Sequence, residues 1–129
     1  MNRWTEVELR RIADSDELEI ASVRSDGTLR RPVTIWVVCV GDDVYVRSVT
    51  GRAASWFRGA QGRHEARVVV GGVTKDVRLV EPGADAEAID AAYRSKYRRY
   101  AAPIIESIIA PQAGAATLKL VPRATASGA

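Results

Sequence analysis

Residues 45–60, YVRSVTGRAASWFRGA, concentrate hydroxyl and guanidinium groups where a predicted strand leads into a predicted helix. A phosphate is bound by such groups: arginine forks, serine or threonine hydroxyls, and the free N–H groups of a helix start. The candidate ligands are Arg47, Ser48, Thr50, Arg52, Ser55 and Arg58. Side chains alternate in direction along a strand, so the whole set cannot point at one anion. The alternative is equally open: Thr50 caps the helix, the arginines are solvated, and Trp56 with Phe57 fills the core.

Aromatic residues provide a second group of candidates. Trp36 and Trp56 could stack on a planar ring or line a pocket, although buried tryptophans more often simply pack. Tyr93, Tyr97 and Tyr100 follow each other at spacings of four and three, so they share one helix face. This spacing predicts a stripe docked on the rest of the protein with hydroxyls at its rim. Tyr93 or Tyr97 is the first candidate for a proton donor.

The sequence offers no catalytic set of its own. His64 is the single histidine, and no acidic residues with metal-ligand spacing surround it. Cys39 lies in an apolar run and is predicted to be an inert thiol. There is no phosphate-binding loop and no dinucleotide-binding glycine pattern. If the protein is an enzyme, we expect a bound cofactor to supply the chemistry.

Composition and charge are those of one soluble domain. The chain has 129 residues, 47% of them hydrophobic and 27% charged, with a net charge of +3. Residues 47–67 contain five arginines and one acidic residue. This predicts a local basic patch, which suits a small anion better than a long polyanion. Single-stranded nucleic acid is therefore the least favoured partner. The polar N-terminus predicts no signal peptide, no membrane segment is expected, and the expected location is the cytoplasm.

The element pattern predicts an α+β, mainly β, fold. Thr5 and Glu8 form a capping-box pattern for a first helix at 5–14. Strands are predicted at 17–24, 29–40, 44–49, 64–70, 73–80 and 116–121, and further helices at 53–60, 85–100 and 104–109. Antiparallel hairpins dominate, which favours a small six-stranded barrel with an N-terminal helix and a C-terminal helical pair packed outside. We expect one domain over 1–122 and a flexible tail over 123–129.

Several segments together carry a family resemblance. They are Trp4 with its short helix, Asp26-Gly27-Thr28, RPVTIWVV at 31–38, YVRS at 45–48, Gly51, Ser55-Trp56, AYRSKY at 92–97 and TLKLVP at 117–122. The chain resembles the bacterial family named domain of unknown function 2255. That family is similar to the flavin-binding split barrels, which include pyridoxamine-phosphate oxidases and deazaflavin-dependent nitroreductases.

The resemblance implies a cofactor site. Split barrels hold the cofactor phosphate with basic and hydroxyl residues of the middle strands and the following helix. The matching residues are Arg47, Ser48, Thr50, Arg52 and Ser55, with Arg31 also approaching the phosphate. Val33, Thr34, Ile35 and Trp36 would border the ring, and Trp56 would help to wall the pocket. The second phosphate-binding lysine of the oxidases has no match here, and the glycine- and serine-rich motif of the nitroreductases is not found. FMN, an 8-hydroxy-5-deazaflavin coenzyme and no cofactor therefore remain open.

The resulting prediction is an oxidoreductase that uses a flavin or deazaflavin and acts on a small planar acceptor. Split barrels usually dimerise with sites at the interface, so a homodimer is expected. Two other functions remain open. One is a non-catalytic protein that holds flavin, haem or another planar ligand. The other is a cofactor-free isomerase or cyclase that reuses the barrel pocket.

Overall fold

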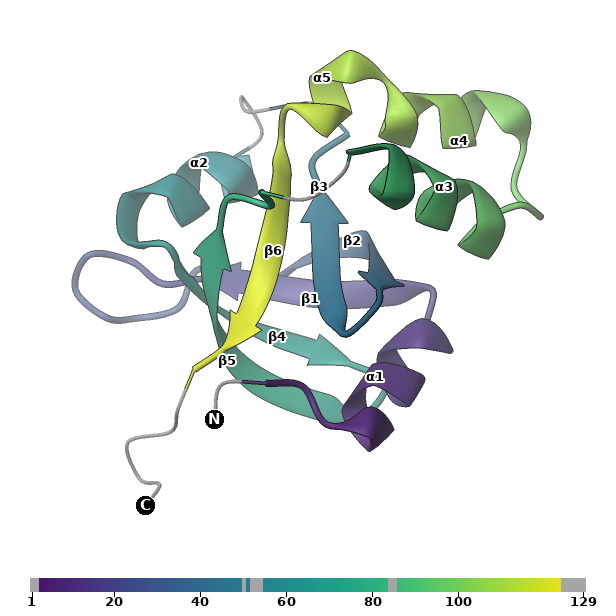
Figure 1. The fold of residues 1–129 in the computed structure, drawn as a ribbon. Helices are drawn as coiled ribbons and strands as arrows, with labels where there is room; N and C mark the ends of the chain where they lie inside the picture. Colours follow the sequence, from purple (N-terminus) through teal and green to yellow (C-terminus); the bar gives the residue numbers. More distant parts are fainter. Residues whose placement is uncertain (1–2, 50, 52–54, 84–85, 124–129) are drawn as a thin grey trace.

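The computed structural model describes residues 3–49, 51, 55–83 and 86–123, and its strands close into one barrel. The strand order is β1-β2-β3-β6-β5-β4, and every neighbouring pair is antiparallel. The strands are β1 Glu17–Ser22, β2 Val33–Val40, β3 Asp43–Arg47, β4 Glu65–Val70, β5 Val73–Val80 and β6 Thr117–Pro122. The predicted six-stranded antiparallel barrel is therefore confirmed (Figure 1).

The helices pack outside the barrel, as predicted. They are α1 Glu6–Ala13, α2 Ser55–Arg63, α3 Ala86–Lys96, α4 Ala102–Ile109 and α5 Pro111–Gly114. The capping box that opens α1 is present: Thr5 Oγ1 accepts from the Glu8 amide, and the Glu8 carboxylate accepts from the Thr5 amide. Figure 1 shows α3, α4 and α5 together on one side of the barrel.

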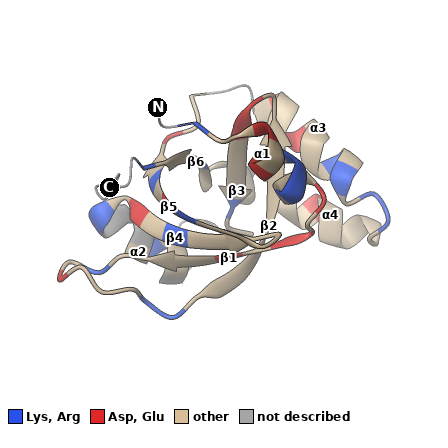
Figure 2. Cartoon of the chain, turned by 90° about the horizontal axis from the view of Figure 1, so that it is seen from below, with Lys and Arg blue, Asp and Glu red and all other residues tan. Residues whose placement is uncertain are grey.

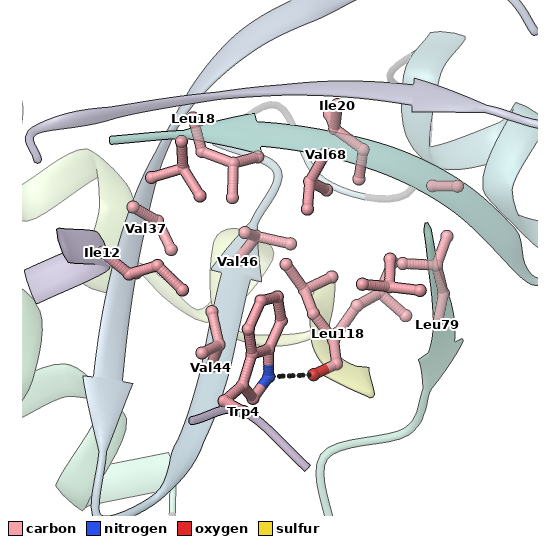
Figure 3. Close-up of a cluster of buried hydrophobic side chains, with 14 of the residues drawn as sticks. Trp4, Ile12, Leu18, Ile20, Val37, Val44, Val46, Val68, Leu79 and Leu118 are labelled. Carbon is pink, nitrogen blue, oxygen red and sulfur yellow. Dashed lines mark hydrogen bonds between the residues drawn. The ribbon is translucent and has the colours of Figure 1, made fainter. Parts of the chain in front are cut away.

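Alternating apolar residues fill the barrel interior. Leu18, Ile20, Val37 and Val68 are among the buried side chains that meet there. Trp4 joins them, and its indole Nε1 donates a hydrogen bond of 2.9 Å to the carbonyl of Leu120 (Figure 3). The residues before α1 are thereby fixed to the last strand, which explains why a tryptophan precedes the first helix.

A second apolar cluster lies between the outer face of β2 and β3 and helices α3 and α4. It contains Val38, Tyr45, Ile89, Tyr93, Tyr97 and Ile108 as buried residues, with Trp36 packed against them. The tyrosine stripe of α3 and the residues just after it is thus docked on the barrel, as its spacing predicts, but Tyr93 and Tyr97 are fully buried, so the predicted position of their hydroxyls at a rim is wrong.

Element ends differ from the sequence-based prediction at several places. β2 begins at Val33 instead of residue 29, because Leu29 only bridges Val23 and Pro32 has no amide for a ladder. α3 ends at Lys96, and α5 was not predicted. Arg123, predicted as the first residue of the flexible tail, is bound to β5, because its amide donates a hydrogen bond to the carbonyl of Asp76. The rest of the predicted tail lies outside the described residues.

β2 changes its partner halfway along its length. Residues 33–36 pair with β1, and residues 37–40 pair with β3. At the change, the Tyr97 hydroxyl accepts from the Val37 amide at 3.0 Å and donates to the Asp16 carbonyl at 2.5 Å. The hydroxyl thus bridges the Val37 amide and the Asp16 carbonyl, in place of a direct hydrogen bond between β2 and the residue before β1. This bridge fixes the end of the tyrosine stripe to the barrel.

Candidate functional site

A cavity of about 480 Å³ opens beside the first half of β2, within the size range of small-molecule pockets, which is about 300–1,000 Å³. All of the residues predicted to border the ring or to wall the pocket line this cavity. They are Val33, Thr34, Ile35, Trp36 and Trp56, together with two of the predicted phosphate ligands, Arg47 and Ser48. β2, the end of β3 and α2 therefore bring the predicted residues to one place.

Four lining residues were missed by sequence reasoning: Val49, Ile104, Ser107 and Ile108. Three of them belong to α4, whose sequence APIIESII is apolar for a helix on the outside of a barrel. Ile104 and Val49 are 47% and 48% exposed, so they form an apolar rim. The excess of isoleucine in this short helix is the signal that could have identified it.

The remaining predicted phosphate ligands are not placed at the cavity. Thr50 and Arg52 lie outside the described residues, and so does the side chain of Ser55. Arg31 is exposed and is not among the described residues that line the cavity. The roles of these four residues stay predictions.

The main chain of Thr34 contributes a polar edge to the cavity. Val37 turns its amide to the β1 side, where it meets the Tyr97 hydroxyl. Main-chain groups alternate in direction along an antiparallel strand, so those of Thr34 face away from β1. In the register of the described residues, β2 pairs with β3 only from Val37 onward. By this register the Thr34 amide and carbonyl point away from β1, to a side on which no described strand pairs with them, and Thr34 is one of the residues that line the cavity.

Trp36 forms one wall of the cavity, and two tyrosines packed against its ring fix its orientation. Its ring stacks on Tyr97 with centroids 3.8 Å apart and planes 2° apart, and Tyr100 packs against it at 4.9 Å. Because the Tyr97 hydroxyl is hydrogen-bonded to the main chain, this stack cannot turn freely. The indole is a pre-oriented flat surface, which suits an aromatic ligand.

Tyr93 and Tyr97 pack behind Trp36 and are not among the described residues that line the cavity. Burial raises the pKa of both hydroxyls. The Tyr97 hydroxyl is engaged by the main chain, whereas the buried Tyr93 hydroxyl has no hydrogen-bond partner among the described residues. Their predicted role as proton donors stays a prediction, and this geometry favours a supporting role instead.

Arg47 lines the cavity, yet its guanidinium is bound to the protein itself. Its side chain is buried, and Nη1 forms an ion pair of 2.5 Å with Asp90 of α3. Nη1 also donates to the Ile108 carbonyl at 3.1 Å, and Nε donates to Thr117 Oγ1 at 2.9 Å. Arg47 therefore joins β3, β6, α3 and α4 around the site, whether or not it also contacts an anion.

Three of the five arginines of the predicted basic patch are paired with carboxylates. Besides Arg47, Arg63 pairs with Glu65 at 2.9 Å, and Arg67 pairs with Asp76 at 2.8 Å. Figure 2 shows basic and acidic stretches interspersed around the barrel. Among the described residues, basic and acidic side chains therefore alternate along the surface rather than forming one basic face (Figure 2).

The comparisons with known proteins identify the family. The sequence matches, over residues 8–120, the family described as "Uncharacterized protein conserved in bacteria". The chain belongs to this family, DUF2255. The resemblance stated from the sequence is thereby confirmed. No curated protein matched the sequence.

Solved structures share the fold at low sequence identity. A conserved hypothetical protein of Mycobacterium tuberculosis is 11% identical, with a TM-score of 0.63 over 96% of this chain and 82% of its own. The haem storage protein HutZ of Vibrio cholerae is 15% identical, with a TM-score of 0.59 over 92% and 89%. An F420 reductase is 17% identical, with a TM-score of 0.56 over 93% and 94%. At these identities the likeness shows the barrel fold alone.

Two further properties bear on function. No helix within the described residues is both long and apolar enough to cross a membrane. The described residues also contain no group of three or more histidine, cysteine, aspartate or glutamate side chains placed to hold a metal ion.

Proposed function

We propose that the cavity beside β2 binds the ring of FMN or of an 8-hydroxy-5-deazaflavin coenzyme, and that the protein is an oxidoreductase for a small planar acceptor. One observation carries the proposal: an apolar cavity of about 480 Å³ with a fixed indole wall and a polar main-chain edge. A flavin-type ring has apolar faces and a polar heteroatom edge, so it fits this donor set. The shared fold of an F420 reductase adds support.

The residues of this chain would bind and orient the group. Trp36 and Trp56 would cover the ring faces, and the Thr34 amide and carbonyl would meet its polar edge. The phosphate or acidic tail would be bound by Thr50, Arg52 and Ser55, the ligands that the sequence predicts. When bound, the flavin or deazaflavin would supply the hydride-transferring ring. Arg47 would hold the walls together through Asp90.

Haem is less well supported than a flavin-type ring. Protein-bound haem iron takes axial ligands such as histidine, cysteine, methionine or tyrosine. The described residues that line the cavity include none of these types. A planar organic ring that needs no metal ligand agrees better with the cavity.

The proposal is tested by titrating the pure protein with FMN and with the oxidised deazaflavin coenzyme while following visible absorbance. Val49→Trp, at the exposed apolar rim, should obstruct the cavity and weaken binding at least tenfold, or by about 1.4 kcal/mol. Val7→Trp is the matched control, since Val7 is 58% exposed on α1 and outside the cavity lining.

The two variants make the outcome decisive. Binding that is lost in Val49→Trp and kept in Val7→Trp supports the site. Equal affinity of both variants would place the ligand elsewhere and refute the assignment. Turnover is then measured with NADPH or the reduced deazaflavin as donor and a series of quinones and nitroaromatics as acceptors. Binding without turnover would refute the oxidoreductase part and leave a binding protein.

A further inference from the structure

A second cavity, of about 530 Å³, opens where the end of α1, the outer face of β2 and the end of α3 meet. It shares no described lining residue with the cavity beside the first half of β2. Its lining includes Cys39, Lys96, Arg98 and Arg99, and no described carboxylate. The cavity is therefore lined by one lysine and two arginines.

Lys96 is held in an unusual way for a lysine. Its Nζ donates to the carbonyls of Val37 and Ile12, at 2.7 and 3.1 Å. Among the described residues no carboxylate lies within ion-pair distance of this amine, whereas Lys75 pairs with Glu8 at 2.6 Å. A neutral amine has two N–H donors and one lone pair, so two carbonyls satisfy both of its donors. This arrangement accommodates the neutral form and keeps its lone pair available.

Burial of Lys96 makes the neutral form more accessible than it is in an ordinary lysine. Lys96 is half-buried, and burial lowers its pKa to about 8. The charged and titratable groups near it are Asp14 at the end of α1, Cys39 on β2, the two arginines of the cavity, and Tyr97, whose ring centroid lies 5.5 Å from Nζ. Arg99 is paired with Asp16. Arg98 donates to the Ser95 carbonyl and is exposed, so its charge can meet an anion.

We propose that Lys96 forms an imine with a small aldehyde or ketone that carries a carboxylate. The lone pair of Nζ attacks the carbonyl carbon, a C–N bond forms, and the carbonyl oxygen takes up a proton. Loss of the second amine proton and of the hydroxyl group, as water, gives the imine. No oxidant or reductant takes part. Arg98 binds the carboxylate, and Cys39 stays a thiol, because burial raises its pKa.

The test is reductive trapping on the full chain at pH 7.5, with glyoxylate as the probe and cyanoborohydride to trap the imine. The sequence has three lysines, Lys75, Lys96 and Lys119, so peptide mapping resolves each one. About a quarter of amines with a pKa of about 8 are neutral at this pH, against about one in a thousand for an ordinary lysine. We expect Lys96 to be labelled at least tenfold faster than the other two lysines.

Two variants and a neutral aldehyde complete the design. Lys96→Arg should abolish the fast label, and Lys75→Arg should leave it unchanged. Glyoxylate should label Lys96 faster than propionaldehyde does, and Arg98→Gln should remove that preference. Labelling of Lys96 at the rate of the other lysines would overturn the proposal. Equal rates with glyoxylate and propionaldehyde in the unmodified protein would also overturn it.

Discussion

Replacement of Arg47 by methionine tests whether this arginine holds the walls of the cavity together. The change removes the partner of Asp90 and also the donors to Ile108 and Thr117. Removing one member of a buried ion pair costs about 3–5 kcal/mol. The Asp90 side chain is 26% exposed, so water compensates part of that loss. We expect the free energy of unfolding to fall by about 3 kcal/mol, with the lost hydrogen bonds included.

The measurement is urea unfolding followed by tryptophan fluorescence and far-ultraviolet circular dichroism. Asp90→Asn and the double variant Arg47→Met/Asp90→Asn complete a double-mutant cycle. We expect a coupling energy of at least about 1 kcal/mol, because the two charges are in direct contact. A loss below about 1 kcal/mol in Arg47→Met, with no coupling to Asp90, would refute the reasoning. Arg47 would then be free to serve mainly as an anion ligand.

Two further predictions concern the tyrosine stripe and the buried amine. Tyr97→Phe leaves the Val37 amide without its partner and should cost about 1–3 kcal/mol of unfolding free energy; Tyr100→Phe, whose hydroxyl has no hydrogen bond among the described residues, should change it by less than about 0.5 kcal/mol. Equal losses of unfolding free energy in the two variants would show that the Tyr97 hydroxyl does not bridge β2 to Asp16. Because burial lowers the pKa of Lys96 to about 8 in the folded state, the unfolded chain binds the proton more tightly above that pH. The unfolding free energy of the unmodified protein, minus that of Lys96→Arg, should therefore rise between pH 8 and the ordinary lysine pKa of about 10.4, as measured by urea midpoints. A difference that does not change with pH would contradict the lowered pKa.

The barrel was predictable because patterns within short segments indicate its individual strands and helices. Period-two alternation in 17–24 and 64–70 marks half-buried strands, and Thr5 with Glu8 marks a helix start. The first half of β2 was predicted to border a ring because its sequence resembles a ring-bordering strand, and it lines a cavity in the structure. These signals lie within single elements, so no tertiary information was needed.

Other parts of the site depend on contacts between distant elements. Arg47 looked like an anion ligand because its partner Asp90 lies 43 residues later on α3, and nothing local indicates that pairing. The role of α4 depends on how that helix docks against α3. Lys96 resembles any helix-end cation until folding places two main-chain carbonyls around it. Buried charge pairing and cavity formation follow from helix docking, which a periodic pattern does not specify.

The most direct test of the proposed function is a crystal structure of the protein bound to FMN or to the oxidised deazaflavin coenzyme. The proposal predicts ring density between Trp36 and Trp56, with a polar ring edge within hydrogen-bond distance of the Thr34 main chain. A ring seated anywhere else, including the cavity beside Lys96, would contradict it.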